Sequence, residues 1–207
     1  EGGKDMGNRI YPIGIQNFEK IRKEGYVYVD KTALMYKLVK SGSYFFLSRP
    51  RRFGKSLLIS TLEAYFEAKR DLFEGLAVET LEKDWVKRPV LHLDLNIGKY
   101  DTPDSLDKIL NETLDYWESL YGTRSAETTL ALRFAGVVGR AYEQSGERVA
   151  ILIDEYDKPL LQAIGNEELQ REFRNTLKPF YGVLKTMDGC IKFALLTGVT
   201  KFGKVSV

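Results

Sequence analysis

The chain has 207 residues, a length that favours one domain or one domain with a small extension. Hydrophobic residues make up 43% and charged residues 29%, an ordinary balance for a globular protein. The chain has 31 Lys and Arg residues and 29 Asp and Glu residues, which gives a net charge of +2. This small charge excludes a protein that binds nucleic acid through overall positive charge.

Two residue counts limit metal and redox chemistry. The single cysteine, Cys190, excludes an internal disulfide and a zinc site made of several cysteines. The single histidine, His92, excludes a His-rich metal site. No apolar run approaches the roughly 18 residues that cross a membrane, and no signal peptide opens the chain. We therefore expect a cytoplasmic protein without a membrane partner.

Residues 1–9 are polar and rich in glycine, and we expect them to be disordered or foreign to the natural protein. Short apolar runs and longer amphipathic stretches then alternate. The first run, 44–47, predicts a strand, and apolar residues at helical spacing predict a helix over 55–69. A second strand is predicted over 90–95. Pro103, which follows Thr102, predicts that the next helix begins there.

The expected inward face of that helix consists of Leu106, Ile109, Leu110, Thr113, Trp117 and Leu120. Another helix is predicted from about 126 to 142. The run 149–153 is the most uniformly apolar in the chain and predicts a central strand buried on both faces. Asn166 is a candidate cap for a long helix, and 191–199 is the fourth predicted strand. Strands that alternate with helices indicate a parallel sheet in an α/β fold.

The segment Arg49–Ser56 carries the first chemical signal. Aligned on G-x-x-x-x-G-K-S/T, it matches at Gly54, Lys55 and Ser56 but has Arg49 at the first glycine. A strand precedes it and a helix follows, so backbone N–H groups at the helix N-terminus can wrap a phosphate. Lys55 would reach the β- and γ-phosphates, and the Ser56 hydroxyl would hold Mg²⁺. The alternative is a basic surface turn that opens a helix.

Acidic and hydroxyl side chains follow two later strands. Asp154 and Glu155 end the apolar run, at the edge of a parallel sheet where ligands bind. Asp154 would join the Mg²⁺ shell, and Glu155 would polarise a water for attack on the γ-phosphate. The alternative is a solvated acidic loop. Thr197, at the end of the fourth strand, either senses the γ-phosphate or belongs to a turn formed with Gly198.

Four segments together resemble the bacterial AAA-ATPase-like family: Tyr26–Thr32, Ser48–Leu58, Ile153–Leu160 and Leu196–Phe202. The resemblance covers residues 10–207, and Arg at the position of Arg49 is usual in that family. It implies a P-loop NTPase fold of the additional-strand type, a parallel sheet sandwiched by helices. In that fold the strand that ends at Asp154 is separated from the P-loop strand by the strand 191–199.

The resemblance supports a Walker A motif at Arg49–Ser56, a Walker B motif at Asp154 and Glu155, and a sensor near Thr197. The expected cofactors are ATP and Mg²⁺. The expected nucleotide-binding residues are Arg49, Pro50, Arg51, Arg52, Phe53, Gly54, Lys55, Ser56 and Leu57. The expected catalytic residues are Lys55, Glu155 and Thr197, and the expected metal ligands are Ser56 and Asp154.

The sequence allows two roles for each of several other residues. Asp30 either shapes a base pocket or caps the helix that follows, and Asp157 either joins the acidic site or caps a turn; capping is favoured for both. His92 and Asp94 share one face of a strand, where a structural role is favoured. An arginine finger is not assigned among Arg51, Arg52, Arg133 and Arg140. No base-reading motif such as N-K-x-D distinguishes ATP from GTP.

The leading hypothesis is an ATP-binding and ATP-hydrolysing module. The resemblance implies a C-terminal nuclease-like domain of the PD-(D/E)xK type in full-length members, and we expect this domain to lie outside the 207 residues. We also expect the domain 10–207 to lack the last strand and the helical lid of the fold. The alternatives are a nucleotide-gated switch with negligible turnover and a nucleic-acid-processing component. The expected partners are ATP, a second copy of the chain, and nucleic acid through the C-terminal domain.

Overall fold

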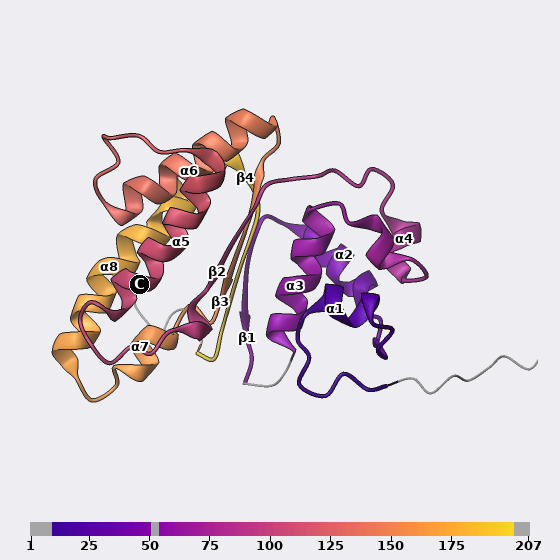
Figure 1. The fold of residues 1–207 in the computed structure, drawn as a ribbon, viewed down its shortest axis with the longest axis horizontal. Coiled ribbons are helices and arrows are strands. Elements are labelled where there is room, and N and C mark those ends of the chain that lie inside the picture. The colour runs from indigo at the N-terminus through magenta and orange to yellow at the C-terminus, as the bar shows by residue number, and fades with distance from the viewer. Residues whose placement is uncertain (1–9, 51–53, 201–207) are drawn as a thin grey trace, which may run out of the picture.

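The computed structural model describes residues 10–50 and 54–200. Within these residues one sheet of parallel strands has the order β1-β4-β3-β2 (Figure 1). The strands are β1 (Tyr44–Ser48), β2 (Val90–Asp94), β3 (Val149–Asp154) and β4 (Ile191–Gly198). As expected, β4 lies between β1 and β3. The α/β fold and its parallel sheet of the P-loop NTPase type are therefore confirmed.

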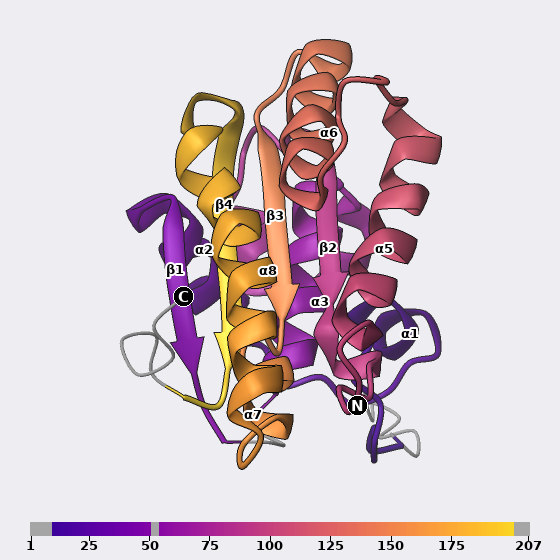
Figure 2. The same cartoon turned by 90° about the vertical axis from the view of Figure 1, so that its left-hand side faces the viewer.

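Helices cover both faces of the sheet. They are α1 (Phe18–Lys23), α2 (Thr32–Ser41), α3 (Lys55–Phe66), α4 (Ala77–Leu81), α5 (Ser105–Tyr121), α6 (Leu130–Ser145), α7 (Lys158–Gln162) and α8 (Glu167–Thr186). In Figure 1, α1 to α4 lie on one side of the sheet and α5 to α8 on the other. Figure 2 looks onto the second layer, where α8 and α6 cross in front of the strands. None of the described helices has the length and apolar character needed to cross a membrane.

The sheet divides the core into two apolar clusters. Ile151 and Ile153 of β3 pack with α5, α6 and α8, whereas Ala150 and Leu152 pack on the opposite face with α3. All six residues of β3 are buried, as predicted for a central strand. Because the strands are parallel, their carboxyl ends meet at one end of the sheet. Helix α3 begins at this same end, where Ser56 contacts Asp154.

Two predicted helix boundaries are wrong on either side of β2. α3 ends at Phe66 instead of at residue 69, because Ala68 adopts the left-handed conformation with φ of 56°. α5 begins at Ser105 instead of at Pro103, because the Ser105 N–H donates to the Thr102 carbonyl and closes a turn before the helix. Leu120, predicted to face inward, is exposed. The buried stripe of α5 consists of Leu106, Leu110, Leu114 and Trp117.

Capping side chains set the beginnings of α6 and α8. α6 begins at Leu130 instead of near residue 126, because the Thr129 hydroxyl accepts a hydrogen bond from the Leu132 N–H. The predicted cap at Asn166 is confirmed: its side-chain oxygen accepts from the Leu169 N–H at 3.1 Å.

Candidate functional site

The amino-terminal end of α3 faces the carboxyl ends of β4 and β3. Gly54 precedes the helix with φ of 74°, a left-handed conformation that costs a residue with a Cβ about 1 kcal/mol. Among the residues that the structure describes, none outside the adjacent chain lies within 4 Å of a Cβ added at Gly54. Glycine therefore adopts the backbone conformation of the turn into α3 without the strain that a side chain would add.

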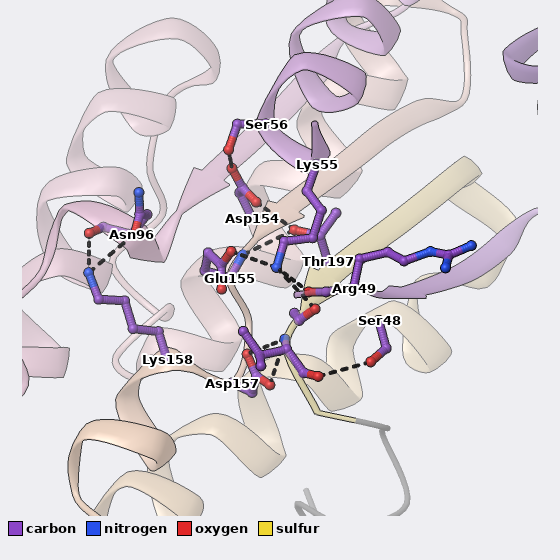
Figure 3. A network of polar contacts seen from close by, with 12 residues as sticks. Ser48, Arg49, Lys55, Ser56, Asn96, Asp154, Glu155, Asp157, Lys158 and Thr197 are labelled. Carbon is purple, nitrogen blue, oxygen red and sulfur yellow. Dashed lines mark hydrogen bonds and ion pairs between the residues drawn. The ribbon is translucent and has the colours of Figure 1, made fainter. Parts of the chain in front are cut away.

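Lys55 is buried, yet its ammonium is fully satisfied (Figure 3). Its Nζ donates to the Arg49 carbonyl at 2.8 Å and to the Gly198 carbonyl at 3.2 Å. The same nitrogen lies 2.9 Å from Oε1 of Glu155, in an ion pair with little solvent exposure on either side. These contacts draw together the ends of β1 and β4 and the residue after β3 around one cation.

The Asp154 carboxylate accepts hydrogen bonds from two hydroxyl groups, one on α3 and one on β4. Ser56 Oγ of α3 donates to Oδ2 at 2.7 Å, and Thr197 Oγ1 of β4 donates to Oδ1 at 2.5 Å. Asp154 is nearly inaccessible and Thr197 completely so. The two expected metal ligands, Ser56 and Asp154, are thus in direct contact.

Glu155 has an uncommon backbone for a residue with a side chain. Its φ of 56° lies in the left-handed region, which costs roughly 1–2 kcal/mol unless the surroundings enforce it. Here the Glu155 N–H donates to Thr197 Oγ1 at 3.2 Å, and the Tyr156 N–H donates to the Thr197 carbonyl at 2.9 Å. The turn directs the Glu155 carboxylate toward Lys55, as Figure 3 shows. Thr197 therefore positions both Asp154 and Glu155.

Asp157 does not use its side chain as a helix cap, so the favoured interpretation of this residue is wrong. It occupies the N-cap position of α7 without a capping hydrogen bond from its carboxylate. The fully buried carboxylate accepts instead from the Val199 N–H at 3.0 Å, and from the Thr200 N–H and hydroxyl at 2.7 and 2.6 Å. Asp157 thus fastens the segment after β4 to the loop after β3.

A polar cavity of about 260 Å³ lies at these groups. From the expected set it is lined by Gly54, Lys55, Ser56 and Glu155, and it also contains Gln16, Asn96, Lys158 and Gln162, which sequence analysis did not single out. Lys158 Nζ donates to the carbonyl of Asn96 and lies 3.3 Å from its side-chain oxygen. The sequence shows that Lys158 follows Glu155 by three residues. It does not show that the Lys158 side chain enters the cavity, because that depends on the turn that leads into α7.

Two ammonium groups, a hydroxyl and the N-terminus of α3 outweigh the single carboxylate of Glu155 in the lining, so the cavity is suited to a polyanion. Its chemistry also fits a magnesium ion. Mg²⁺ is commonly held by one or two protein oxygens together with phosphates and waters, and the Ser56 hydroxyl and Asp154 carboxylate offer such a pair. Across the described ranges no group of three or more His, Cys, Asp and Glu side chains is arranged to hold a metal by itself.

The remaining expected nucleotide-binding residues do not line this cavity or are not among the residues that the structure describes. Arg49 contributes its carbonyl to Lys55, while its guanidinium points away from the carboxylates in Figure 3. Pro50 is exposed, and Leu57 lines a separate apolar cavity. Arg51, Arg52 and Phe53 lie outside the described residues.

Two arginines considered for a finger are engaged elsewhere. Arg133 Nη2 pairs with Asp115 at 2.6 Å and Glu118 at 2.7 Å, which joins α6 to α5. Arg140 pairs with Glu127 at 2.5 Å, next to the start of α6. Neither arginine lines the polar cavity.

Asp30 and His92 make structural contacts. Asp30 accepts from the Thr32 N–H and hydroxyl and from the Ala77 N–H, so it caps the first turn of α2 and ties it to α4. Burial acts to raise the pKa of Asp30, but these hydrogen bonds outweigh it and hold the pKa below its usual value. His92 Nδ1 lies 3.4 Å from a Glu63 carboxylate oxygen.

Comparisons with known proteins identify the family of this chain. The chain is 41% identical over 204 residues to a protein of Azotobacter chroococcum mcd 1 described as "Uncharacterized protein in vnfD 5'region". The match covers 98% of this chain and 39% of that relative's length. No solved structure matches. The family described as "Predicted AAA-ATPase" matches residues 12–207, and the chain therefore belongs to this AAA-ATPase-like family.

Proposed function

We propose that the polar cavity binds the phosphates of ATP together with Mg²⁺, and that the site hydrolyses the γ-phosphate. One observation carries the proposal: Lys55, Ser56, Asp154 and Glu155 come from different parts of the chain and converge at the N-terminus of α3. Membership of a predicted ATPase family supports nucleotide binding in general terms.

The roles follow from charge and position. The N–H groups at the start of α3 and the Lys55 ammonium would bind the β- and γ-phosphates, and Lys158 adds a second positive charge in the cavity. Ser56 and Asp154 would hold Mg²⁺, which supplies further neutralisation of phosphate charge when bound. Arg49 would act through its carbonyl, which holds Lys55 in place.

Hydrolysis transfers the γ-phosphoryl group to water. The water oxygen bonds to phosphorus, and the bond from phosphorus to the bridging oxygen of ADP breaks. Glu155 is the acidic side chain that lines the polar cavity and is placed to orient that water. Thr197 is then a positioning residue, because its hydroxyl contacts Asp154 and the Glu155 N–H.

Calorimetry with Mg-ATP tests the binding site. Lys55→Ala should weaken binding more than tenfold, since one lost charge-assisted contact costs about 1.5–3 kcal/mol. Lys55→Ala leaves the buried Glu155 carboxylate without its cationic partner, which can destabilise the fold. The double variant Lys55→Ala/Glu155→Gln removes both charges and avoids this unpaired carboxylate. Lys108→Ala, at an exposed ion pair on α5, is the control. Equal affinity in all four proteins would refute the site.

The same site without appreciable turnover would make a nucleotide-gated switch. The Lys55–Glu155 ion pair favours this alternative, because a carboxylate that is paired with Lys55 does not orient a water molecule. Phosphate release by the full-length protein separates the two functions.

From the family resemblance we also propose coupling to a C-terminal nuclease-like effector. Salt-dependent DNA binding by the full-length protein is the test of this coupling.

A further inference from the structure

The polar cavity contains two lysines in different electrostatic surroundings. Lys55 is buried, and the Glu155 carboxylate at 2.9 Å neutralises its ammonium. Lys158 is half-buried, and its Nζ contacts two neutral acceptors, the carbonyl and the side-chain oxygen of Asn96 (Figure 3). Within the part of the chain that the structure describes, no carboxylate pairs with Lys158.

The net charge of the cavity lining therefore depends on Lys158. Among the described residues of this lining, the charged side chains are those of Lys55, Glu155 and Lys158. The charges of Lys55 and Glu155 cancel, so Lys158 supplies the remaining positive charge. Asp154 lies next to the lining, and in the proposed function Mg²⁺ offsets its charge. An ammonium gains more from an anionic acceptor than from a neutral one, so Lys158 favours an anionic ligand over Asn96.

The backbone on both sides of the Lys158–Asn96 contact is fixed by hydrogen bonds. The Lys158 N–H donates to the Glu155 carbonyl at 3.0 Å and closes the turn that leads into α7. The buried Asp157 carboxylate anchors the same turn to the segment after β4. Asp94 Oδ1 accepts from the Asn96 N–H at 2.8 Å and shapes the turn after β2. The flexible four-carbon stem of Lys158 is therefore the part that can move its ammonium into the cavity.

The position of Lys158 in the chain indicates which phosphate it would meet. In the proposed function Glu155 orients the water that attacks the γ-phosphorus atom, so the γ-phosphate lies next to Glu155. Lys158 follows Glu155 by one tight turn, and both side chains line the same cavity. In Figure 3 the two ammonium groups lie on opposite sides of Glu155. Lys55 would thus reach the phosphates from α3 and Lys158 from the start of α7.

We propose that Lys158 is a specificity-determining residue, which binds the terminal phosphate and makes the site prefer ATP to ADP. The inference rests on the proposed function, since the phosphates occupy the polar cavity. When the triphosphate binds, the Lys158 ammonium exchanges the neutral oxygens of Asn96 for anionic oxygens of the γ-phosphate. A diphosphate held at Lys55 has no γ-phosphate, so Lys158 stays on Asn96.

Calorimetry with two Mg²⁺-bound nucleotides tests this role: ADP, and an ATP analogue in which nitrogen bridges the β- and γ-phosphorus atoms. The nitrogen bridge resists hydrolysis, so the measurement reports binding without turnover. Wild type should bind the analogue more tightly than ADP. Lys158→Ala should bind the analogue at least about tenfold more weakly than wild type, the scale of one lost charge-assisted contact. It should bind ADP within about twofold of wild type, which also shows that the variant is folded.

Two further variants serve as controls. Lys158→Arg keeps a positive charge at this position and should keep a preference for the analogue. Lys99→Ala removes a lysine that is close in sequence to Asn96 but pairs with Asp101 at 2.7 Å and does not line the polar cavity. It should bind both nucleotides as wild type does.

The outcomes separate this proposal from that for the phosphate site. If wild type binds both nucleotides in a Lys55-dependent manner, an unchanged preference in Lys158→Ala would overturn the role of Lys158 and leave the phosphate site standing. Equal weakening of both nucleotides by Lys158→Ala, or equal affinity of wild type for both, would also overturn this role. If wild type binds neither nucleotide, both proposals fail.

Discussion

The Lys55 ammonium and the Glu155 carboxylate neutralise each other across 2.9 Å, although one begins α3 and the other follows β3. In the proposed function these groups have different partners, since Lys55 binds phosphate and Glu155 orients water. Entry of the phosphates would therefore draw Lys55 away from Glu155 and leave the carboxylate free to accept a hydrogen bond from water. In the proposed function, substrate binding and activation of the site would therefore be coupled through this ion pair.

Glu155→Gln should separate binding from turnover. We expect Mg-ATP affinity equal to or tighter than that of wild type, because the variant no longer competes with phosphate for Lys55. Hydrolysis by the full-length protein should fall at least about a hundredfold, the scale of positioned acid–base assistance. Calorimetry and steady-state phosphate release measure the two quantities.

Glu147→Gln is the control for this prediction, because Glu147 pairs with Arg88 before β3 and does not line the polar cavity. It should change neither affinity nor turnover. Unchanged hydrolysis in Glu155→Gln would assign Glu155 a structural role.

Asp157→Ala should destabilise the fold more than Asp157→Asn. The alanine variant removes the acceptor for the N–H groups of Val199 and Thr200, and unsatisfied buried donors cost about 1–3 kcal/mol each. Asparagine keeps one side-chain oxygen as an acceptor and should recover part of the loss. Urea denaturation of the two variants and wild type measures this difference. Equal stability of all three would show that the carboxylate does not hold the end of β4.

Glu82 should make stability depend on pH in the acid range. Burial acts to raise its pKa, but hydrogen bonds from Tyr65, the Asp84 N–H and Lys40 lower the pKa to about 2 from the ordinary 4.5. A carboxylate with a depressed pKa stabilises the folded state above its unfolded pKa, and this contribution disappears as pH falls from about 4.5 to about 2. At neutral pH it amounts to at most roughly 3 kcal/mol.

Glu82→Gln should therefore be less stable than wild type at pH 7, with a difference that narrows between about pH 4.5 and 2. Urea denaturation across this range measures the gap. Glu112→Gln, at an exposed position of α5, should show no such gap at any pH. A gap for Glu82→Gln that stays constant with pH would contradict the expected titration.

Local sequence patterns were sufficient to predict the four strands and the position of Gly54-Lys55-Ser56 between a strand and a helix. The run 149–153 is apolar at every position because both faces of β3 are covered, and such a strand is recognisable without knowledge of its neighbours. Gly54-Lys55-Ser56 between a strand and a helix is likewise a local signal. The order of the strands came instead from the resemblance to a family, since periodicity does not encode which strands are adjacent.

Tertiary structure decided what depends on contacts between distant segments. Asp157 precedes a helix and has the sequence signature of a cap, yet its carboxylate binds backbone N–H groups more than forty residues later, because β4 ends directly beside it. Lys158 enters the polar cavity only through the turn into α7, and the apolar cavity that Leu57 lines forms only when residues 11–12 lie near α2 and α3. Side-chain direction and the closing of a cavity are properties of packing, so no short stretch of sequence determines them.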